Sequence, residues 1–289
     1  MIELKKEQKA MAIVTIKLKE FKEQASPTEH AIIDYILENP DETSKLTIYE
    51  LAERTFTSPS SIIRLCKKNG YTGYKDFSKE LIYEQAIREN YKETDITDLS
   101  RTDEMEDIIM KVTHKNILSL EETQMMLDKD TLSACVQAIH NCERLSIFGI
   151  GASQIVAKDA KLKFTRINKM AFVSEDWHTQ LLYAKNMSEG DVALVISYSG
   201  KTEEMIKCAE TAKTNGATVI SITQLGDSPI EQIANYSLYV ASNEFSFRSG
   251  AMSSRLAQLN LIDILYSTYV SQMYDESLEI LEKTQIKKE

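Results

Sequence analysis

Small hydroxyl side chains and one glycine follow directly on a short apolar run at residues 192–196. Ser197, Ser199, Gly200 and Thr202 stand between this run and an amphipathic stretch. The run predicts a strand that is buried on both faces, and the stretch after it has helical spacing. Where such a strand meets a helix, hydroxyls and the free N–H groups of the first helical turn converge, and a glycine lets the backbone come close. This arrangement predicts binding of a phosphate or another small oxyanion, although a turn that merely connects the strand to the helix would have the same composition.

A second small-residue turn strengthens the binding interpretation. Gly149, Gly151 and Ser153 come at the end of another apolar run, in a part of the chain where strands and helices alternate from Arg144 onward. This alternation predicts a parallel sheet with helices on both faces, whose ligands bind beyond the carboxyl ends of the strands. Both turns fall on that edge. The chain has no G-x-x-x-x-G-K-[ST], and Gly149-x-Gly151 lacks a third glycine, so we expect no nucleotide cofactor. We also expect no metal site.

The second candidate site lies near the amino terminus. Two capping boxes, at Ser26 and Thr47, and the pair Ser58-Pro59 predict short helices joined by a tight turn, with the proportions of a helix-turn-helix. The last of these helices carries the residues that we expect to contact DNA: Ser58, Ser60, Ser61, Arg64, Lys67 and Lys68. The serines would lie nearest to phosphates and base edges, Arg64 would reach a guanine edge or a phosphate, and the lysines would contact phosphates. A helical interaction domain with a solvated basic face is the alternative.

One residue in this region does not fit the expected turn. Phe56 stands where a helix-turn-helix normally has a residue that tolerates positive φ. Either the turn has another geometry here, or the phenylalanine is accommodated with strain.

These elements predict a chain of two domains. We expect an all-α helix-turn-helix domain at residues 11–92, a linker and connecting helix at 93–130, and an α/β domain with a parallel sheet flanked by helices at 131–276. The long amphipathic helix of the connection should span 105–126. Residues 1–10 are charged and patternless, and Met11 is an alternative start, so we assign residues 1–10 no structural role.

Composition limits the partners of the chain. With 289 residues, 43% of them hydrophobic, the chain can bury proper cores. Its net charge of −10 argues against a general polyanion binder, but residues 54–79 hold six basic residues against the single acid Asp76. The four cysteines are scattered without a C-x-x-C, which predicts free thiols in a reducing cytoplasm, and no apolar stretch is long enough to cross a membrane.

Taken together, the motifs resemble those of the RpiR (MurR/RpiR) family of bacterial transcription regulators. The amino-terminal resemblance rests on Ser26-Pro27-x-Glu29, Asn39-Pro40 and Ser58-Pro59-Ser60-Ser61-Ile62-x-Arg64-Leu65-Cys66-Lys67-Lys68-x-Gly70-Tyr71. The carboxyl-terminal half resembles a sugar isomerase (SIS) domain through Gly149-x-Gly151-x-Ser153 and Ser197-x-Ser199-Gly200-x-Thr202-x-Glu204. The resemblance covers about residues 20–275.

The resemblance implies a regulator of sugar-catabolism genes that binds operator DNA and senses a phosphosugar. Ser197, Ser199, Gly200 and Thr202 would hold the phosphate, and Gly151 and Ser153 would contact the phosphate or the sugar. A homodimer or homotetramer would present paired recognition helices to the operator. The resemblance does not identify the sugar, or say whether the protein represses or activates.

Catalysis is the main competing hypothesis, because isomerases of the SIS superfamily need a general acid or base near the sugar. Glu175, His178, Glu204 and Glu244 are the candidates. Glu204 is better explained as a favourable acid in the first turn of a helix, and Glu175 and His178 as residues that open one. We therefore expect a sensor without catalytic residues, with a phosphosugar isomerase or lyase as the alternative and a scaffold that does not bind DNA as a third interpretation.

Overall fold

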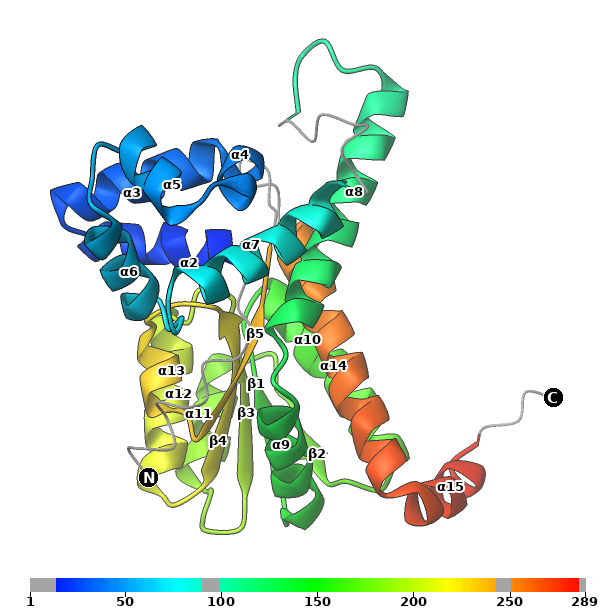
Figure 1. Ribbon diagram of the computed structural model, residues 1–289. Helices are drawn as coiled ribbons and strands as arrows, with labels where there is room; N and C mark the ends of the chain where they lie inside the picture. Colours follow the sequence, from blue (N-terminus) through cyan, green and yellow to red (C-terminus); the bar gives the residue numbers. More distant parts are fainter. Residues whose placement is uncertain (1–13, 90–98, 243–250, 286–289) are drawn as a thin grey trace. The chain divides into compact units, whose positions relative to one another are not determined.

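The computed structural model describes residues 14–89, 99–242 and 251–285 and divides into two compact units, residues 1–97 and 98–289 (Figure 1). The leader at 1–10, part of the predicted linker and Glu244 lie outside the described residues. Each unit has its own apolar core, as expected for two domains.

The first unit is entirely helical within its described part. Its elements are α2 (Val14–Phe21), the 3-10 turn η1 (Lys22–Gln24), α3 (Pro27–Glu38), α4 (Pro40–Lys45), α5 (Ile48–Arg54), α6 (Pro59–Lys68) and α7 (Tyr74–Glu89). Both predicted capping boxes are present, at Ser26 and Thr47, and Ser58 caps α6. Helices α2 and α4 were not predicted. Asn39-Pro40 ends α3 but also starts α4, because proline is well suited to the first position of a helix.

The core of the first unit fixes how α5 and α6 are presented. Fully buried side chains from α3, α5, α6 and α7 pack together, among them Ile32, Leu51, Ile62, Leu65 and Phe77. Ile62 and Leu65 occupy the inner face of α6, so the polar side chains of this helix are left outside.

The second unit contains a parallel sheet of five strands in the order β2-β1-β3-β4-β5. The strands are β1 (Leu145–Phe148), β2 (Ala171–Phe172), β3 (Val192–Ile196), β4 (Thr218–Gln224) and β5 (Tyr236–Val240). All five residues of β3 are buried, as its unbroken apolar sequence predicted. The expected α/β architecture is thereby confirmed.

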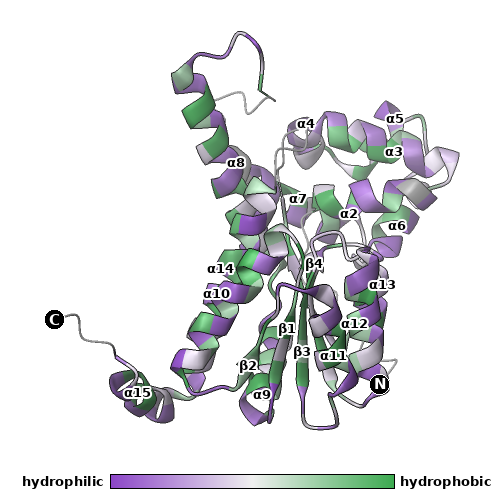
Figure 2. Cartoon of the chain, turned by 180° about the vertical axis from the view of Figure 1, so that it is seen from behind, coloured by the Kyte–Doolittle hydropathy of each residue, from purple (hydrophilic) through white to green (hydrophobic). Residues whose placement is uncertain are grey.

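Helices cover both faces of this sheet (Figure 1). One layer contains α9 (Lys129–Asn141), α10 (Ala152–Arg166) and α14 (Met252–Gln272), and the other contains α11 (Trp177–Lys185), α12 (Glu203–Thr214) and α13 (Pro229–Ile233). In Figure 2 the strands are coloured as hydrophobic, whereas hydrophilic and hydrophobic residues alternate along the helices. This distribution is typical of amphipathic helices that bury one face on an apolar sheet.

The predicted connecting helix is α8 (Met105–Met126), with the expected bounds. It packs within the second unit, where the Ser253 hydroxyl donates to Asn116 at 3.2 Å and the Ala241 N–H donates to the Thr123 hydroxyl at 3.0 Å. The last described helix is α15 (Tyr274–Lys283). None of the described helices is long and apolar enough to span a membrane.

The four cysteines are free and buried, in agreement with the sequence prediction. Burial raises the pKa of the Cys66, Cys135 and Cys208 thiols to about 12 and that of Cys142 to about 11. They are therefore neutral, unreactive thiols at physiological pH.

Candidate functional site

Both predicted ligand turns lie at the switch point of the sheet, between β1 and β3, where the strand order reverses. Strands β1 and β3 are neighbours, with Phe148 opposite Val195 at their carboxyl ends. From these ends the chain leaves toward opposite faces, through α10 after β1 and through α12 after β3. In a doubly wound sheet of this order, the crevice between these two strands is where ligands bind. The fold thus brings the turns at 149–153 and 197–202 to one edge.

Hydrogen bonds of its own serine and threonine residues hold the turn after β3. The Ser197 N–H donates to the Ile222 carbonyl at 3.0 Å, and the Ser197 hydroxyl donates to Thr202 at 3.3 Å. The Ser199 hydroxyl accepts from the Lys201 N–H at 3.2 Å. Thr202 is the N-cap of α12, but its side chain does not cap the first N–H groups of this helix. These groups have the positive end of a helix dipole behind them, which suits an anion.

Gly200 is required by the close packing of this turn. Its φ is +62°, and a Cβ at this position would lie 2.2 Å from Oγ and 2.5 Å from Cβ of Ser228. Ser228 is itself fixed, because its hydroxyl caps α13 by accepting from the Glu231 N–H at 3.3 Å. The Ser-Gly sequence therefore allows the turn to lie directly against the start of α13.

The turn after β1 is organised by a buried glutamine, Gln180 of α11. Its side chain accepts from the Gly149 N–H at 3.1 Å and donates to the carbonyls of Gly149 and Ser174, both at 3.0 Å. Gly151 has φ +62° and forms the N-cap of α10. Ser153 donates its hydroxyl to Gln258 Oε1 at 3.2 Å, so this hydroxyl is directed toward α14.

Three buried polar residues of this edge were missed by the sequence analysis. They are Gln180, Thr223 and Gln258, each at most 1% exposed. In the described part of the chain, Thr223 Oγ1 and Gln258 Nε2 have no hydrogen-bond partner, and such groups are rare in folded proteins. The one signal for Gln258 is a polar residue on a helix face that also contains Ala257, Leu261 and Leu265.

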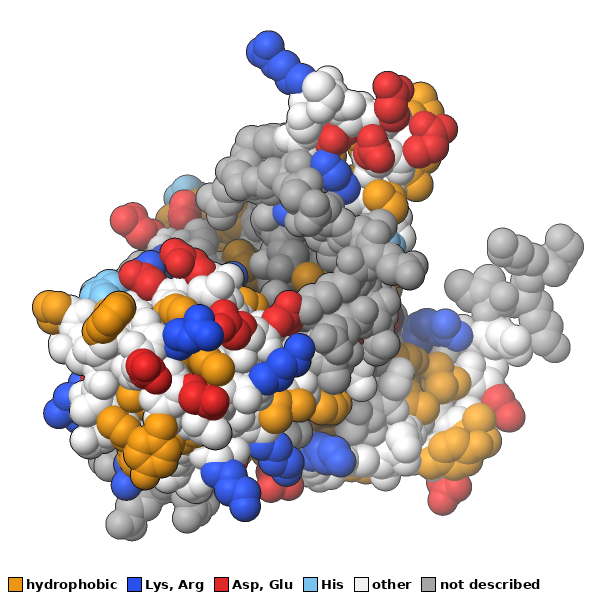
Figure 3. Space-filling model, turned by 45° about the horizontal axis from the view of Figure 1, so that its top comes forward, with side chains coloured by type: hydrophobic (Ala, Val, Ile, Leu, Met, Phe, Trp, Pro, Cys, Tyr) orange, Lys and Arg blue, Asp and Glu red, His pale blue; other side chains and the backbone are white. Residues whose placement is uncertain are grey.

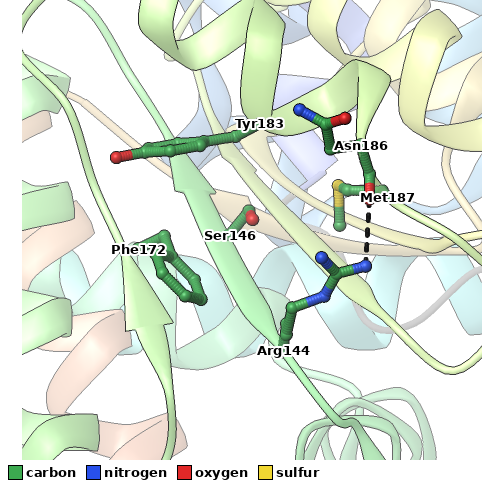
Figure 4. A pocket seen from close by; sticks show the side chains of 6 residues that line it. All are labelled: Arg144, Ser146, Phe172, Tyr183, Asn186 and Met187. Atoms are coloured by element: carbon green, nitrogen blue, oxygen red, sulfur yellow. Dashed lines mark hydrogen bonds between the residues drawn. The ribbon is translucent and has the colours of Figure 1, made fainter.

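A cavity of about 440 Å³ lies near the amino end of β1 (Figure 4). The predicted turns follow the opposite, carboxyl ends of β1 and β3. Arg144, Ser146, Phe172, Tyr183, Asn186 and Met187 line it. The Arg144 guanidinium donates to both carboxylate oxygens of Asp191, at 3.0 and 2.5 Å, and to the Asn186 carbonyl at 3.0 Å. Although burial acts to raise the pKa of Asp191, these bonds hold it below its usual value. Because the cation is already neutralised, this cavity offers little to a phosphate, and the ligand site suggested by the motifs fits an anion better.

Two of the three described candidates for catalysis, Glu175 and His178, are open to solvent. The third, Glu204, is half-buried in the first turn of α12. The Glu175 side chain is 77% exposed and forms an ion pair with Lys158, and the His178 side chain is 78% exposed. Neither side chain is buried, whereas burial commonly tunes a general base. Among the residues that the structure describes, no group of three His, Cys, Asp or Glu side chains could hold a metal ion.

The candidate DNA-binding helix, α6, presents most of its predicted residues to solvent. Ser58, Ser60 and Arg64 are exposed, and Ser61 is half-buried. The Ser58 hydroxyl accepts from the Ser61 N–H at 3.2 Å and lies 3.2 Å from the Ser60 hydroxyl. Three hydroxyls therefore cluster at the amino end of α6.

Lys68 has a second role. Its Nζ lies 2.7 Å from the carboxylate of Glu29, which is 2% exposed. Burial raises the pKa of Glu29, but hydrogen bonds from Lys68 and Ser26 outweigh this effect and lower it to about 2. Lys68 thus ties α6 to the start of α3, whereas Lys67 is exposed and has no such bond among the described residues.

The backbone conformation of the turn before α6 shows how Phe56 is accommodated. This residue has φ +52°, so the phenylalanine itself adopts the left-handed conformation. The turn keeps the expected geometry, with strain at Phe56.

Comparison with known proteins identifies both domains. The family model for the helix-turn-helix domain of the rpiR family matches residues 13–87, and the model for the SIS domain matches residues 138–268. The class is therefore a helix-turn-helix protein with a carboxyl-terminal SIS domain. More particularly, the chain belongs to the RpiR family of HTH-type transcriptional regulators.

The similarity to known proteins covers nearly the whole chain. An uncharacterised HTH-type transcriptional regulator of Caldanaerobacter subterraneus is 37% identical over 274 residues, which are 95% of this chain and 96% of that protein. The uncharacterised regulator YbbH of Bacillus subtilis is 32% identical over 270 residues, covering 92% of this chain and 94% of YbbH. Among solved structures, the Vibrio vulnificus NanR protein complexed with ManNAc-6P is 29% identical, with a TM-score of 0.58, and covers 94% of this chain and 96% of NanR.

Proposed function

We propose that this regulator binds operator DNA through α6 and a phosphosugar through the crevice between β1 and β3. The observation that carries the proposal is the meeting of two small-residue turns at the switch point of the sheet. The complex of NanR with ManNAc-6P supports a phosphosugar as the class of ligand. The genes under control would be those of sugar catabolism, and the protein would act in the cytoplasm.

The phosphate would lie in the turn at 197–202. Ser197, Ser199 and Thr202 would donate hydroxyl hydrogen bonds, and the first N–H groups of α12 would complete the site. Gly200 keeps this turn compact. Gly151 and Ser153 of the neighbouring turn would contact the phosphate or the sugar. Groups around the turn at 149–153 would then determine which sugar is bound.

A thermal-shift panel of sugar phosphates tests this assignment. A ligand at 100 times its dissociation constant stabilises the folded state by about 2.7 kcal/mol. We expect one or more phosphosugars to raise the melting temperature of the wild-type chain and not that of the Ser199→Ala/Thr202→Ala variant, while DNA binding is kept. An unchanged response of the variant would show that the phosphate binds elsewhere.

The proposal also holds that the chain is a sensor and not an isomerase or lyase. The exposure of Glu175 and His178 supports this part. The same panel, followed by product analysis, tests it: conversion of any sugar phosphate by the pure protein would overturn it.

A further inference from the structure

An exposed aromatic ring occupies a strained backbone position just before α6. The Phe56 side chain is 98% exposed, and its φ is +52°. For a bulky residue such a φ is a genuine outlier. The ring does not belong to the apolar core of the first unit. Nothing in the described fold therefore requires a phenylalanine here.

The backbone around Phe56 is a Schellman ending of α5. The Thr57 N–H donates to the Ala52 carbonyl at 2.9 Å across the left-handed residue, which satisfies a carbonyl at the helix end. Three other helices end with the same bond, Tyr71 to Cys66, Lys169 to Phe164 and Ala217 to Ala212, each at 3.0 Å. The left-handed residues there are Gly70, Asn168 and Gly216.

These endings show what the same chain uses when the motif has only to stop a helix. Glycine has no Cβ to clash in the left-handed conformation, and asparagine tolerates it. Phe56 is the exception within the described residues. A phenylalanine here strains the backbone and leaves a large apolar surface in water. Both costs would be offset if a partner covers the ring.

We propose that the Phe56 ring contacts an apolar surface of operator DNA, beside the polar contacts of α6. This inference rests on the proposed DNA-binding function. Phe56 precedes Ser58, the N-cap of α6, by two residues, so it lies in the turn that leads into the exposed amino end of this helix. A recognition helix enters the major groove with this end first. The apolar surface there is a thymine methyl group or the face of a deoxyribose.

The charges near the ring favour nucleic acid as its partner. Arg64 of α6 is exposed, and so is Arg54, two residues before Phe56, which pairs with Glu42 at 3.1 Å. A phosphate backbone would be attracted to these side chains while the ring is desolvated. The ring would therefore contribute to affinity without a charge of its own, and its contribution would depend little on salt.

The test compares stability with DNA affinity, because the inference predicts effects in opposite directions. The probe is a duplex selected from a random-sequence pool by the full-length chain. In Phe56→Asn and Phe56→Gly, relief of the strain should leave the melting temperature unchanged or raise it by up to about 4 °C. The affinity for the duplex should fall about tenfold, as expected when a buried apolar contact is lost. Phe56→Tyr should retain most of the affinity.

Asn168→Gly is the matched control, because Asn168 occupies the same motif in the second unit. It should leave DNA affinity unchanged. Arg64→Ala distinguishes a failure of the proposed DNA-binding role of α6 from a failure of the proposed Phe56 contact. If the wild-type chain selects no DNA, or if Arg64→Ala binds as tightly as wild type, the proposed role of α6 fails. If Arg64→Ala weakens binding but both Phe56 variants bind normally, only the present inference is overturned.

Two further measurements identify what the ring contacts. Replacing each dT of the duplex by dU removes one methyl group. Weaker binding of the wild-type chain but not of Phe56→Asn at one position assigns the ring to that thymine. If no replacement distinguishes the two proteins while the tenfold loss persists, the ring contacts deoxyribose. Sedimentation of the variants tests whether the ring instead contacts a second copy of the chain. A loss of affinity that merely follows dissociation of an oligomer would overturn the DNA contact.

Discussion

At Gly200, two constraints fall on one residue of the proposed phosphate turn. The backbone has φ +62°, and the space for a side chain is already filled by Ser228. Ser228 cannot withdraw without losing its capping bond to α13. The turn and the start of α13 are therefore packed as one structure, and the residue type at position 200 controls both.

Substitution at this position should thus cost more than backbone strain alone. A left-handed conformation costs a non-glycine residue about 1–2 kcal/mol, and overpacking adds about 1–3 kcal/mol. We expect Gly200→Ala to lower the free energy of unfolding by roughly the sum. Gly190→Ala is the control, because Gly190 has φ +92° but its added Cβ would meet nothing closer than 3.9 Å. Urea denaturation measures both, and equal losses would contradict the packing argument.

At the scale of elements, the presentation of α6 depends on how the helices of the first unit are joined. Ile62 and Leu65 bury its inner face, and the ion pair between Lys68 and Glu29 fixes its end to the start of α3. Glu29 also completes the capping box of α3 by accepting from the Ser26 N–H at 2.9 Å. One carboxylate therefore stabilises a helix start and positions the candidate recognition helix.

This carboxylate makes the stability of the first unit dependent on pH. The pKa of Glu29 is about 2 in the folded chain and near 4.5 when the chain is unfolded. A lowered pKa contributes stability that is fully present above the unfolded value and is lost as the pH falls through the folded value. We expect Glu29→Gln to be less stable than wild type at pH 7, and this difference to shrink between pH 4.5 and pH 2. A constant difference, measured by urea denaturation across this range, would argue against the ion pair.

At the scale of the whole molecule, function requires communication between two units with separate cores. Figure 3 shows basic, acidic and apolar side chains interspersed on one face, in keeping with a net charge of −10. We therefore expect DNA binding to depend on local groups and not on the overall field. Helix α8 follows the join between the units and is bonded to α14 through Asn116 and Ser253. We expect a ligand-induced change in the second unit to reach the join through α8, because this helix is bonded to α14.

If the two sites communicate, their coupling must be reciprocal. A phosphosugar that changes the operator affinity by some factor must have its own affinity changed by the same factor when the operator is bound, typically about 5–150-fold. Fluorescence anisotropy with labelled DNA gives one factor, and calorimetric titration of the sugar with and without DNA gives the other. Equal factors are expected. A factor of one in both titrations would show that the sites are independent.

Local sequence was sufficient to predict most of the elements, although not α2, α4 or α15, and to locate the turns of the candidate site. The bounds of β3 and α8 were predicted correctly, because an unbroken apolar run and a long amphipathic period are local signals. The capping boxes at Ser26 and Thr47 were confirmed, since their bonds join residues only three apart. The turn residues from Ser197 to Thr202 were recognisable for the same reason. Their role in binding stays a prediction.

Only the tertiary structure decided which distant residues complete these sites. Gln180 acts on Gly149, Gln258 on Ser153 and Ser228 on Gly200, each across a long stretch of chain, and no spacing in the sequence indicates such pairs. The strand order was also undetermined, because alternating strands and helices fit several parallel arrangements. The sequence by itself determined where polar turns follow buried strands. Packing decided which turns meet, and whether Phe56 could keep a left-handed backbone.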